Sequence, residues 1–193
     1  MVASGTAQTS IKFAAAYWME RFAAGRDVLI CDWGGAFGTD CFFFKKALSV
    51  QFNYLVCEIP EIVTAAKKES SLDEIDFTAR LDQRDIDILY SNGTMTNTDQ
   101  PFFATVERTR PAFIVLNGVE CTNGPTFYTW QIYRKFRRRC VYVSYNLSEI
   151  CGRFESLGYE IVGLWDHGEA RSGAFLDPRA QATYYGFAMK RVK

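Results

Sequence analysis

Short strand-like segments alternate with longer stretches of helical patterning through the first two thirds of the chain. The strand-like segments cover residues 28–31, 54–57, 75–81, 86–90 and 113–116. The helical stretches between them cover residues 39–50, 60–68 and 99–109. Strands that alternate with helices of roughly ten residues form βαβ units with right-handed crossovers. The pattern therefore predicts a Rossmann-like, doubly wound α/β sheet with helices on both faces.

The two ends of the chain have patterns of their own. Residues 11–24 show near-helical spacing of apolar positions with Ser10 as an N-cap, which predicts an amphipathic helix. After a helix predicted at 147–157, two strand-like segments, 159–165 and 183–192, follow without a helix between them. Consecutive strands without a crossover pair antiparallel. We therefore expect a mostly parallel sheet that ends in an antiparallel C-terminal hairpin strand.

Length and charge narrow the class of protein. We expect residues 1–193 to form a single domain, with residues 1–25 as its N-terminal helical segment. Lys plus Arg and Asp plus Glu number 22 each, so no overall charge favours nucleic acid or an anionic membrane. We expect neither a leader peptide nor a membrane span, because no matching apolar run is present. The expected protein is cytoplasmic and binds a small molecule, and a homodimer is compatible with this composition.

The cysteines and the single histidine bear on redox state and metals. None of the six cysteines forms a Cys-x-x-Cys pair, so we expect free thiols in a reducing compartment. With His167 as the one imidazole, a transition-metal site would need ligands that are almost all carboxylates, and we expect no metal. Aromatic residues make up 16% of the chain, more than a core of this size needs, so we expect some of them to line a pocket.

A glycine-rich segment follows the first predicted strand, with the sequence Asp32-Trp33-Gly34-Gly35-Ala36-Phe37-Gly38. Its glycines let the backbone turn tightly and approach a ligand, while the next helix offers unpaired N–H groups. A dinucleotide fingerprint needs Gly-x-Gly-x-x-Gly, but counted from Gly34 the third position is Ala36. Asp32 would repel a pyrophosphate and attract an ammonium group. The loop therefore favours S-adenosylmethionine over NAD.

Further cofactor contacts are expected where other strands end. Glu58 ends the second predicted strand, where a carboxylate can accept hydrogen bonds from both ribose hydroxyls, although NAD proteins share this feature. Asp76 and Phe77 would supply an acceptor and a ring neighbour for adenine, and Ser91-Asn92-Gly93 would meet the methionine end. The alternatives are a glycine-rich turn without a ligand and, for Asp76, a helix cap or a solvated acid. The predicted cofactor contacts are Asp32, Trp33, Gly34, Gly35, Ala36, Gly38, Thr39, Glu58, Ile59, Asp76, Phe77, Ser91, Asn92 and Gly93.

Three motifs in order carry a family resemblance: Asp32-Trp33-Gly34-Gly35, Cys57-Glu58-Ile59-Pro60-Glu61-Ile62-Val63 and Ser91-Asn92-Gly93. With them, residues 28–193 resemble the methyltransferases encoded in bacterial surface-polysaccharide gene clusters. The resemblance implies a class I methyltransferase fold and S-adenosylmethionine as cofactor. After its fifth strand that family carries an Arg-Thr-Pro-like segment, whereas this chain has Asn117-Gly118-Val119-Glu120. We therefore expect a different acceptor site.

Three residues are candidates for a general base, in the region beyond the carboxyl ends of the strands. His167 has an intrinsic pKa near neutrality and lies at the mouth of the predicted hairpin. Glu120 would need desolvation to act as a base, and Tyr133 could equally be a packing residue. His167 could instead be an exposed turn residue. Methyl transfer depends mainly on alignment of the reacting atoms, so a dedicated base is optional.

The run Arg134-Lys135-Phe136-Arg137-Arg138-Arg139 is the one strong charge cluster of the sequence. As the polar face of a solvated helix it needs no function. The alternative is that its guanidinium groups hold an anionic acceptor, such as a phosphosugar or a carboxylate.

Three functions are compatible with these features. The favoured one is an S-adenosylmethionine-dependent methyltransferase acting on O or N of a small-molecule acceptor, either sugar-related or a secondary metabolite. The second is an S-adenosylmethionine-binding protein without methyl transfer, as a pseudoenzyme, a partner subunit or a catalyst of cyclisation or rearrangement. The third is an NAD-dependent oxidoreductase, which Glu58 favours and Ala36 and the antiparallel ending disfavour.

Overall fold

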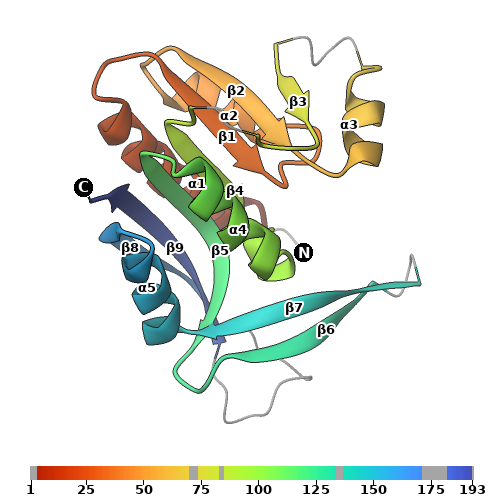
Figure 1. Cartoon of the computed structure of the whole chain (residues 1–193), viewed down its shortest axis with the longest axis vertical. Coiled ribbons are helices and arrows are strands. Elements are labelled where there is room, and N and C mark those ends of the chain that lie inside the picture. The colour runs from red at the N-terminus through yellow and green to blue at the C-terminus, as the bar shows by residue number, and fades with distance from the viewer. Residues whose placement is uncertain (1–3, 70–73, 83–84, 134–136, 171–181, 193) are drawn as a thin grey trace.

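The computed structural model describes residues 4–69, 74–82, 85–133, 137–170 and 182–192 (Figure 1). The helices are α1 (Ser4–Ala23), α2 (Thr39–Ala47), α3 (Pro60–Ala66), α4 (Asp99–Thr109) and α5 (Leu147–Ser156), with a short 3-10 helix η2 (Met95–Asn97). The strands are β1 (Val28–Trp33), β2 (Phe52–Cys57), β3 (Asp76–Thr78), β4 (Ile88–Asn92), β5 (Phe113–Thr122), β6 (Phe127–Tyr133), β7 (Arg138–Asn146), β8 (Tyr159–Ala170) and β9 (Ala182–Arg191).

The first five strands form a parallel sheet. β1 pairs with β2 on one side and with β4 on the other, β3 adds to β2, and β5 adds to β4. The resulting order is β3-β2-β1-β4-β5, so the direction of strand addition reverses between β1 and β4. In such sheets, ligands bind in the crevice beyond the carboxyl ends of the strands at this reversal. The predicted doubly wound sheet is confirmed.

The last two strands complete the sheet in antiparallel fashion. β9 lies between β5 and β8 and pairs antiparallel with both of them. In this register Leu116 of β5 faces Phe187 of β9, and Trp165 of β8 faces Gly186. The predicted antiparallel C-terminal hairpin strand is therefore confirmed.

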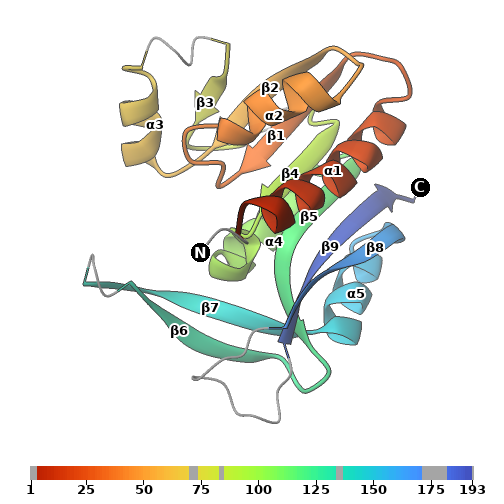
Figure 2. The ribbon, with the colours of Figure 1, turned by 180° about the vertical axis from the view of Figure 1, so that it is seen from behind.

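The sheet separates two hydrophobic cores. On one face α1, α2 and α3 contribute Met19, Phe44 and Val63 to one core, and on the other face α4 and α5 build a second core (Figures 1 and 2). Ile30 of β1 belongs to the first core and the adjacent Cys31 to the second. Because helices cover both faces, successive residues of the central strands are buried, which explains their continuous apolar sequence.

The N-terminal helix and β3 differ from their predictions. α1 begins at Ser4, so Ser10 lies inside the helix and its prediction as the N-cap is wrong. The residues before Ser10 are mostly small and polar, but their helix propensities allow a helix, and they extend α1 by nearly two turns. β3 covers Asp76–Thr78 and not the whole predicted segment 75–81.

A β-hairpin between β5 and α5 was not predicted. β5 runs on to Thr122 through an irregularity between Leu116 and Val119, and β6 and β7 then pair antiparallel along all of β6. We call β6 and β7 the arm; it reaches away from the rest of the sheet (Figure 1). The predicted helix over the basic run is wrong, because residues 138–139 begin β7 and Arg137 has a left-handed φ of 49°. Residues 134–136 lie outside the described part of the chain.

Two further findings concern thiols and membranes. All six cysteines are free thiols, as predicted. Among the helices that the structure describes, none combines the length and the apolar character required to cross a bilayer.

Candidate functional site

The glycine loop joins β1 to α2 at the point where the strand order reverses. Gly34 and Gly38 adopt left-handed φ angles of 74° and 70°, and the Gly34 N–H donates to the Cys57 carbonyl at 2.8 Å. A side chain at Gly34 would collide with Thr94, whose hydroxyl donates to the Gly34 carbonyl at 3.1 Å. Ser91 Oγ donates to the Trp33 carbonyl at 3.0 Å. These contacts bind the loop to the ends of β2 and β4.

Asp32 lies beneath this loop, with only 2% of its surface exposed. Its carboxylate accepts a hydrogen bond of 2.7 Å from the Tyr54 hydroxyl. A Cβ atom at Gly35 would lie 2.2 Å from Asp32 Oδ2, so the loop rests directly on the carboxylate. Burial and, to a smaller extent, the charges of Asp40 and Glu58 raise the pKa of Asp32, the Tyr54 hydrogen bond lowers it, and the net value is about 7. Asp32 therefore changes charge near neutral pH.

A second carboxylate, Asp40, lies in the first turn of α2 and is also buried. It accepts hydrogen bonds from the Tyr90 hydroxyl at 2.8 Å and from Asn92 Nδ2 at 3.2 Å. Lys12 of α1 forms an ion pair with it. This network connects α1, α2 and the end of β4 under the loop.

Glu58 lies at the end of β2 and faces the loop. Its Oε1 accepts from the Ala36 N–H at 3.1 Å, and its Oε2 accepts from the Ile59 N–H at 2.9 Å. The carboxylate is half-buried, so it is accessible to a ligand that lies across the loop. Ala36 itself, with a φ of 50°, is held in a left-handed conformation that costs a non-glycine residue roughly 1–2 kcal/mol.

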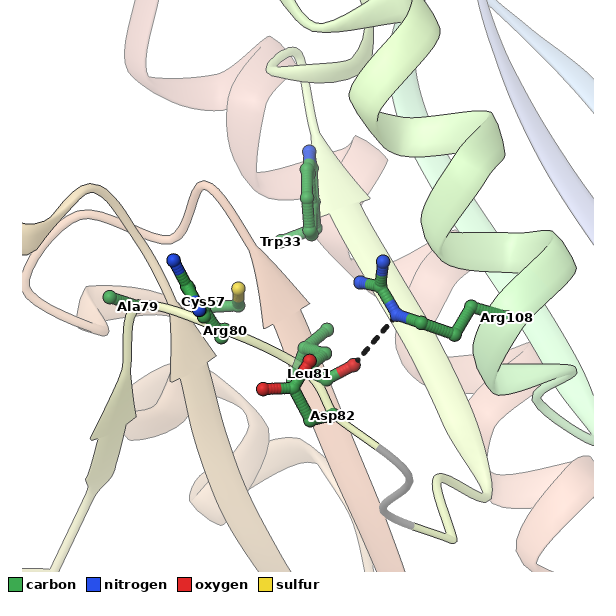
Figure 3. A pocket seen from close by; sticks show the side chains of 7 residues that line it. All are labelled: Trp33, Cys57, Ala79, Arg80, Leu81, Asp82 and Arg108. Carbon is green, nitrogen blue, oxygen red and sulfur yellow. Dashed lines mark hydrogen bonds between the residues drawn. The ribbon is translucent and has the colours of Figure 1, made fainter.

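A cavity of about 290 Å³ lies beside the loop, between the ends of β1 and β2, the segment after β3 and α4. Figure 3 shows Trp33, Cys57 and Arg108 reaching toward it from three different elements. The indole N–H of Trp33 donates to Thr98 Oγ1 at 2.9 Å, and Arg108 Nε donates to the Leu81 carbonyl at 3.2 Å. Burial raises the pKa of the Cys57 thiol to about 11, so this thiol is neutral.

The structure places the two predicted adenine contacts, Asp76 and Phe77, away from this cavity. Asp76 pairs with Leu55 in the body of the sheet, and Phe77 is 8% exposed and packs in the core. The residue of β3 beside Glu58 is Thr78, whose carbonyl accepts from the Glu58 N–H at 3.0 Å. The cavity wall after it is formed by Ala79, Arg80, Leu81 and Asp82, which sequence reasoning missed although they directly follow the strand.

The remaining predicted contacts lie around the loop. Ser91 and Asn92 bond to the loop and to Asp40, and the Gly93 N–H donates to the Asn117 carbonyl at 2.8 Å. Thr39 is exposed at the start of α2, and Ile59, directly after Glu58, is 58% exposed. In the described part of the chain, the buried Oδ1 of Asn117 has no hydrogen-bond partner.

The fold separates one of the three candidate bases from the other two. Glu120 of β5 is fully buried and accepts from Tyr142 at 3.2 Å and from Ser144. His167 lies within β8, so the alternative of an exposed turn residue does not apply, and it is two strands from Glu120 across β9. Tyr133 ends β6 at the far end of the arm. Glu120 and His167 therefore share one region of the sheet and Tyr133 does not.

Comparison with known proteins gives structural but no sequence relatives. No protein-family model matches the chain, and no curated protein matches it by sequence. Solved structures superpose over nearly its whole length. The 1,6-didemethyltoxoflavin-N1-methyltransferase of Burkholderia thailandensis, bound to 1,6-didemethyltoxoflavin and S-adenosylhomocysteine, has a TM-score of 0.60 at 15% identity, covering 94% of this chain and 79% of that one.

Two further structures agree with it. The magnesium protoporphyrin IX methyltransferase ChlM of Synechocystis PCC 6803, with bound S-adenosylmethionine, has a TM-score of 0.60 at 12% identity and covers 96% and 80% of the two chains. The N-terminal domain of EvdMO1 with S-adenosylhomocysteine and D-fucose has a TM-score of 0.61 at 13% identity and covers 95% and 83%. The chain has the class I methyltransferase fold.

Proposed function

We propose that the chain is an S-adenosylmethionine-dependent methyltransferase that acts on an O or N atom of a small-molecule acceptor, either sugar-related or a secondary metabolite. The observation that carries this proposal is the set of three carboxylates around the glycine loop: Asp32, Asp40 and Glu58. Of these, Asp40 is paired with Lys12. An acidic site favours the sulfonium and ammonium groups of this cofactor and disfavours the pyrophosphate of NAD.

The residues present fit each part of the cofactor. The loop has no room for side chains at Gly34 and Gly35, so its backbone would contact the methionine end of the cofactor directly. The buried Oδ1 of Asn117 is an acceptor suited to the ammonium group. Glu58 would accept hydrogen bonds from the ribose hydroxyls. We assign the purine to the cavity beside Trp33, whose volume of about 290 Å³ suits a fused ring system.

The solved neighbours support the cofactor and the size of the acceptor. Their structures contain S-adenosylmethionine or S-adenosylhomocysteine, and two of them also contain 1,6-didemethyltoxoflavin or D-fucose. The kinship with methyltransferases of polysaccharide gene clusters stays a prediction, because no family model matches.

The acceptor site is proposed beyond the ends of β4 and β5, beside Glu120 and His167. When bound, the cofactor supplies a methyl group on a sulfonium. The acceptor lone pair forms the new bond to the methyl carbon, and the sulfur keeps the electrons of the bond that breaks. Glu120 or His167 would take the proton that the acceptor O–H or N–H loses. Both residues belong to the same end of the sheet, whereas Tyr133 lies at the far end of the arm.

Ligand binding and product release test this proposal together. Calorimetric titration of the full chain with S-adenosylhomocysteine and with NAD should give binding of the first alone. Binding of NAD alone would refute the assignment. Release of S-adenosylhomocysteine from S-adenosylmethionine, measured against a panel of sugars and heteroaromatic acceptors, then separates a methyltransferase from a protein that binds the cofactor without methyl transfer.

A further inference from the structure

One face of the arm exposes large apolar side chains in a row. Tyr128, Trp130 and Ile132 alternate along β6 and are 61%, 54% and 67% exposed. Val141 of β7, which pairs with Trp130, is 41% exposed on the same face. Contiguous exposed apolar surface of this kind marks an interaction site more often than isolated exposed residues do.

The strand that carries this row is also an edge strand. β6 stands last in the sheet order, and among the described strands it pairs only with β7. Proteins usually protect such an edge with charges, proline or a covering element. Among the side chains of β6 that the structure describes, the exposed ones are Tyr128, Trp130 and Ile132 and none is charged, so this edge is suited to pair with another strand.

The base of the arm is fixed to the body of the protein. The Tyr128 hydroxyl donates to Asp99 of α4 at 3.1 Å, and Asn97 Nδ2 donates to the Val141 carbonyl at 3.0 Å. Tyr145 of β7 also donates to Asp99, at 2.8 Å. A strand that is already held in its extended form loses little conformational freedom on pairing, which favours association.

We propose that the arm is the interface of a homodimer, in which the β6 strands of two copies pair antiparallel about a two-fold axis at Trp130. Trp130 is the central residue of β6, so each Trp130 faces its symmetry mate. In this register Tyr128 of one copy faces Ile132 of the other, because antiparallel partners run in opposite directions. The exposed rows of the two copies then join on one face of a four-stranded sheet. Such an interface is self-complementary and closed.

Charge along the arm fits the same arrangement. Arg137 and Arg139 are exposed at the tip, and Arg139 lies 4.8 Å from the centre of the Trp130 ring. The exposed Glu149 of α5 accepts a hydrogen bond from Thr126, which directly precedes β6, so this acid lies at the base of the arm. Antiparallel pairing brings the basic tip of each copy toward the acidic base of the other. The proposed dimer therefore pairs opposite charges at both ends, and it does not depend on methyl transfer.

Sedimentation of the full chain across a wide concentration range tests the proposal. We expect the wild type to have twice the chain mass of 22.0 kDa. Trp130→Glu should shift it to monomer. Leu164→Glu is the matched control, since Leu164 is 48% exposed on β8, which pairs only with β9 among the described strands. This variant should stay dimeric.

Charge reversal distinguishes the proposed register from other dimers. Arg139→Glu and Glu149→Arg should each raise the dimer dissociation constant, and the double variant should restore it toward the wild-type value. A wild type that is monomeric at all concentrations would overturn the proposal. So would a dimer that survives Trp130→Glu, or open-ended assemblies in place of a closed pair. Circular dichroism of each variant checks that a monomer is still folded.

Discussion

The hydroxyl of Tyr54 in β2 donates a 2.7 Å hydrogen bond to the carboxylate of Asp32 in the adjacent strand β1. Burial raises the pKa of Tyr54 well above its usual value, so the phenol keeps its proton and acts as the donor. The bond lowers the pKa of Asp32, while burial and the neighbouring acids raise it to about 7. The charge beneath the glycine loop therefore depends on this pair.

Cofactor binding should depend on pH through Asp32. The ammonium group of S-adenosylhomocysteine favours the ionised carboxylate, which is lost as the pH falls through about 7. With one proton linked to binding, the Kd of S-adenosylhomocysteine should be about tenfold higher at pH 6 than at pH 8. Titration calorimetry measures it. Asp32→Asn should bind more weakly at high pH and lose this dependence, whereas an unchanged pH profile in Asp32→Asn would contradict the assignment.

The same linkage affects stability without a ligand. Between pH 3.8, the usual pKa of an aspartate, and about pH 7, the folded chain holds a proton on Asp32 that the unfolded chain has lost. The contribution of this group to the free energy of unfolding therefore declines as the pH rises through that interval. Relative to wild type, Asp32→Asn should gain stability over the same interval. Urea unfolding at several pH values gives the difference.

Tyr54→Phe tests the donor directly. Without the hydroxyl, the ionised form of Asp32 loses a stabilising partner, so the pKa of Asp32 should rise. The midpoint of the pH dependence of S-adenosylhomocysteine binding should then move to higher pH than in wild type. Phe52→Leu, at a half-buried position of the same strand, serves as the control and should leave the midpoint in place. A midpoint that falls in Tyr54→Phe would count against the role of this bond.

The local sequence was sufficient to predict that Asp32 and Glu58 lie at the same edge of the sheet, beside the glycine loop. Asp32 and Glu58 follow short apolar runs that are buried on both faces, and such runs end at the same edge of a parallel sheet. Asp76 and Phe77 were assigned to that edge as well, but pairing of Thr78 with Cys57 decides where β3 ends. That register depends on a neighbouring strand, which a local pattern does not contain.

The arm was missed for a different reason. Tyr128, Trp130 and Ile132 alternate with polar residues, which is the period of a strand. The basic run after them was interpreted as the face of a helix because charge clusters usually are solvated. In the structure Arg139 stacks on Trp130 across two paired strands, a contact that only the hairpin creates.

Gly35 should not tolerate a side chain. A Cβ atom there would lie 2.2 Å from Asp32 Oδ2, so Gly35→Ala must displace either the loop or the carboxylate. Overpacking of this kind costs roughly 1–3 kcal/mol, and S-adenosylhomocysteine binding should weaken together with stability. Gly152→Ala in α5 is the matched control, because nothing lies within 4 Å of its Cβ and alanine favours the helix. Urea unfolding and calorimetry on both variants should separate them. Equal behaviour of the two would argue against a packed loop.

Glu58→Gln should weaken cofactor binding selectively. Glutamine can still accept one hydrogen bond from the Ala36 N–H, but it loses the charge that strengthens bonds to the ribose hydroxyls. A charged hydrogen bond contributes about 1.5–3 kcal/mol, so the Kd of S-adenosylhomocysteine should rise roughly tenfold or more. Glu61→Gln, on the exposed first turn of α3, should leave the Kd unchanged. If both variants bind like wild type, Glu58 does not hold the ribose.

Asp99 should be a larger contributor to stability than any surface ion pair. It is 6% exposed and accepts from Tyr145 at 2.8 Å, from Arg153 at 2.9 Å and from Tyr128 at 3.1 Å, which joins α4, α5 and the arm. Asp99→Asn removes the charge and one acceptor oxygen. Because Arg153 is 40% exposed and water replaces part of the loss, we expect a cost of about 1–3 kcal/mol.

The control for Asp99 is Glu74→Gln, which breaks the exposed pair with Lys45 and should cost less than about 1 kcal/mol. Urea unfolding of both variants gives the comparison. Since Asp99 also holds the Tyr128 end of β6, Asp99→Asn should increase hydrogen exchange in the backbone of the arm more than in β1. β7 also pairs with β5, and these strand hydrogen bonds do not involve Asp99. If hydrogen exchange in Asp99→Asn changes equally in the arm and in β1, strand pairing alone holds the arm.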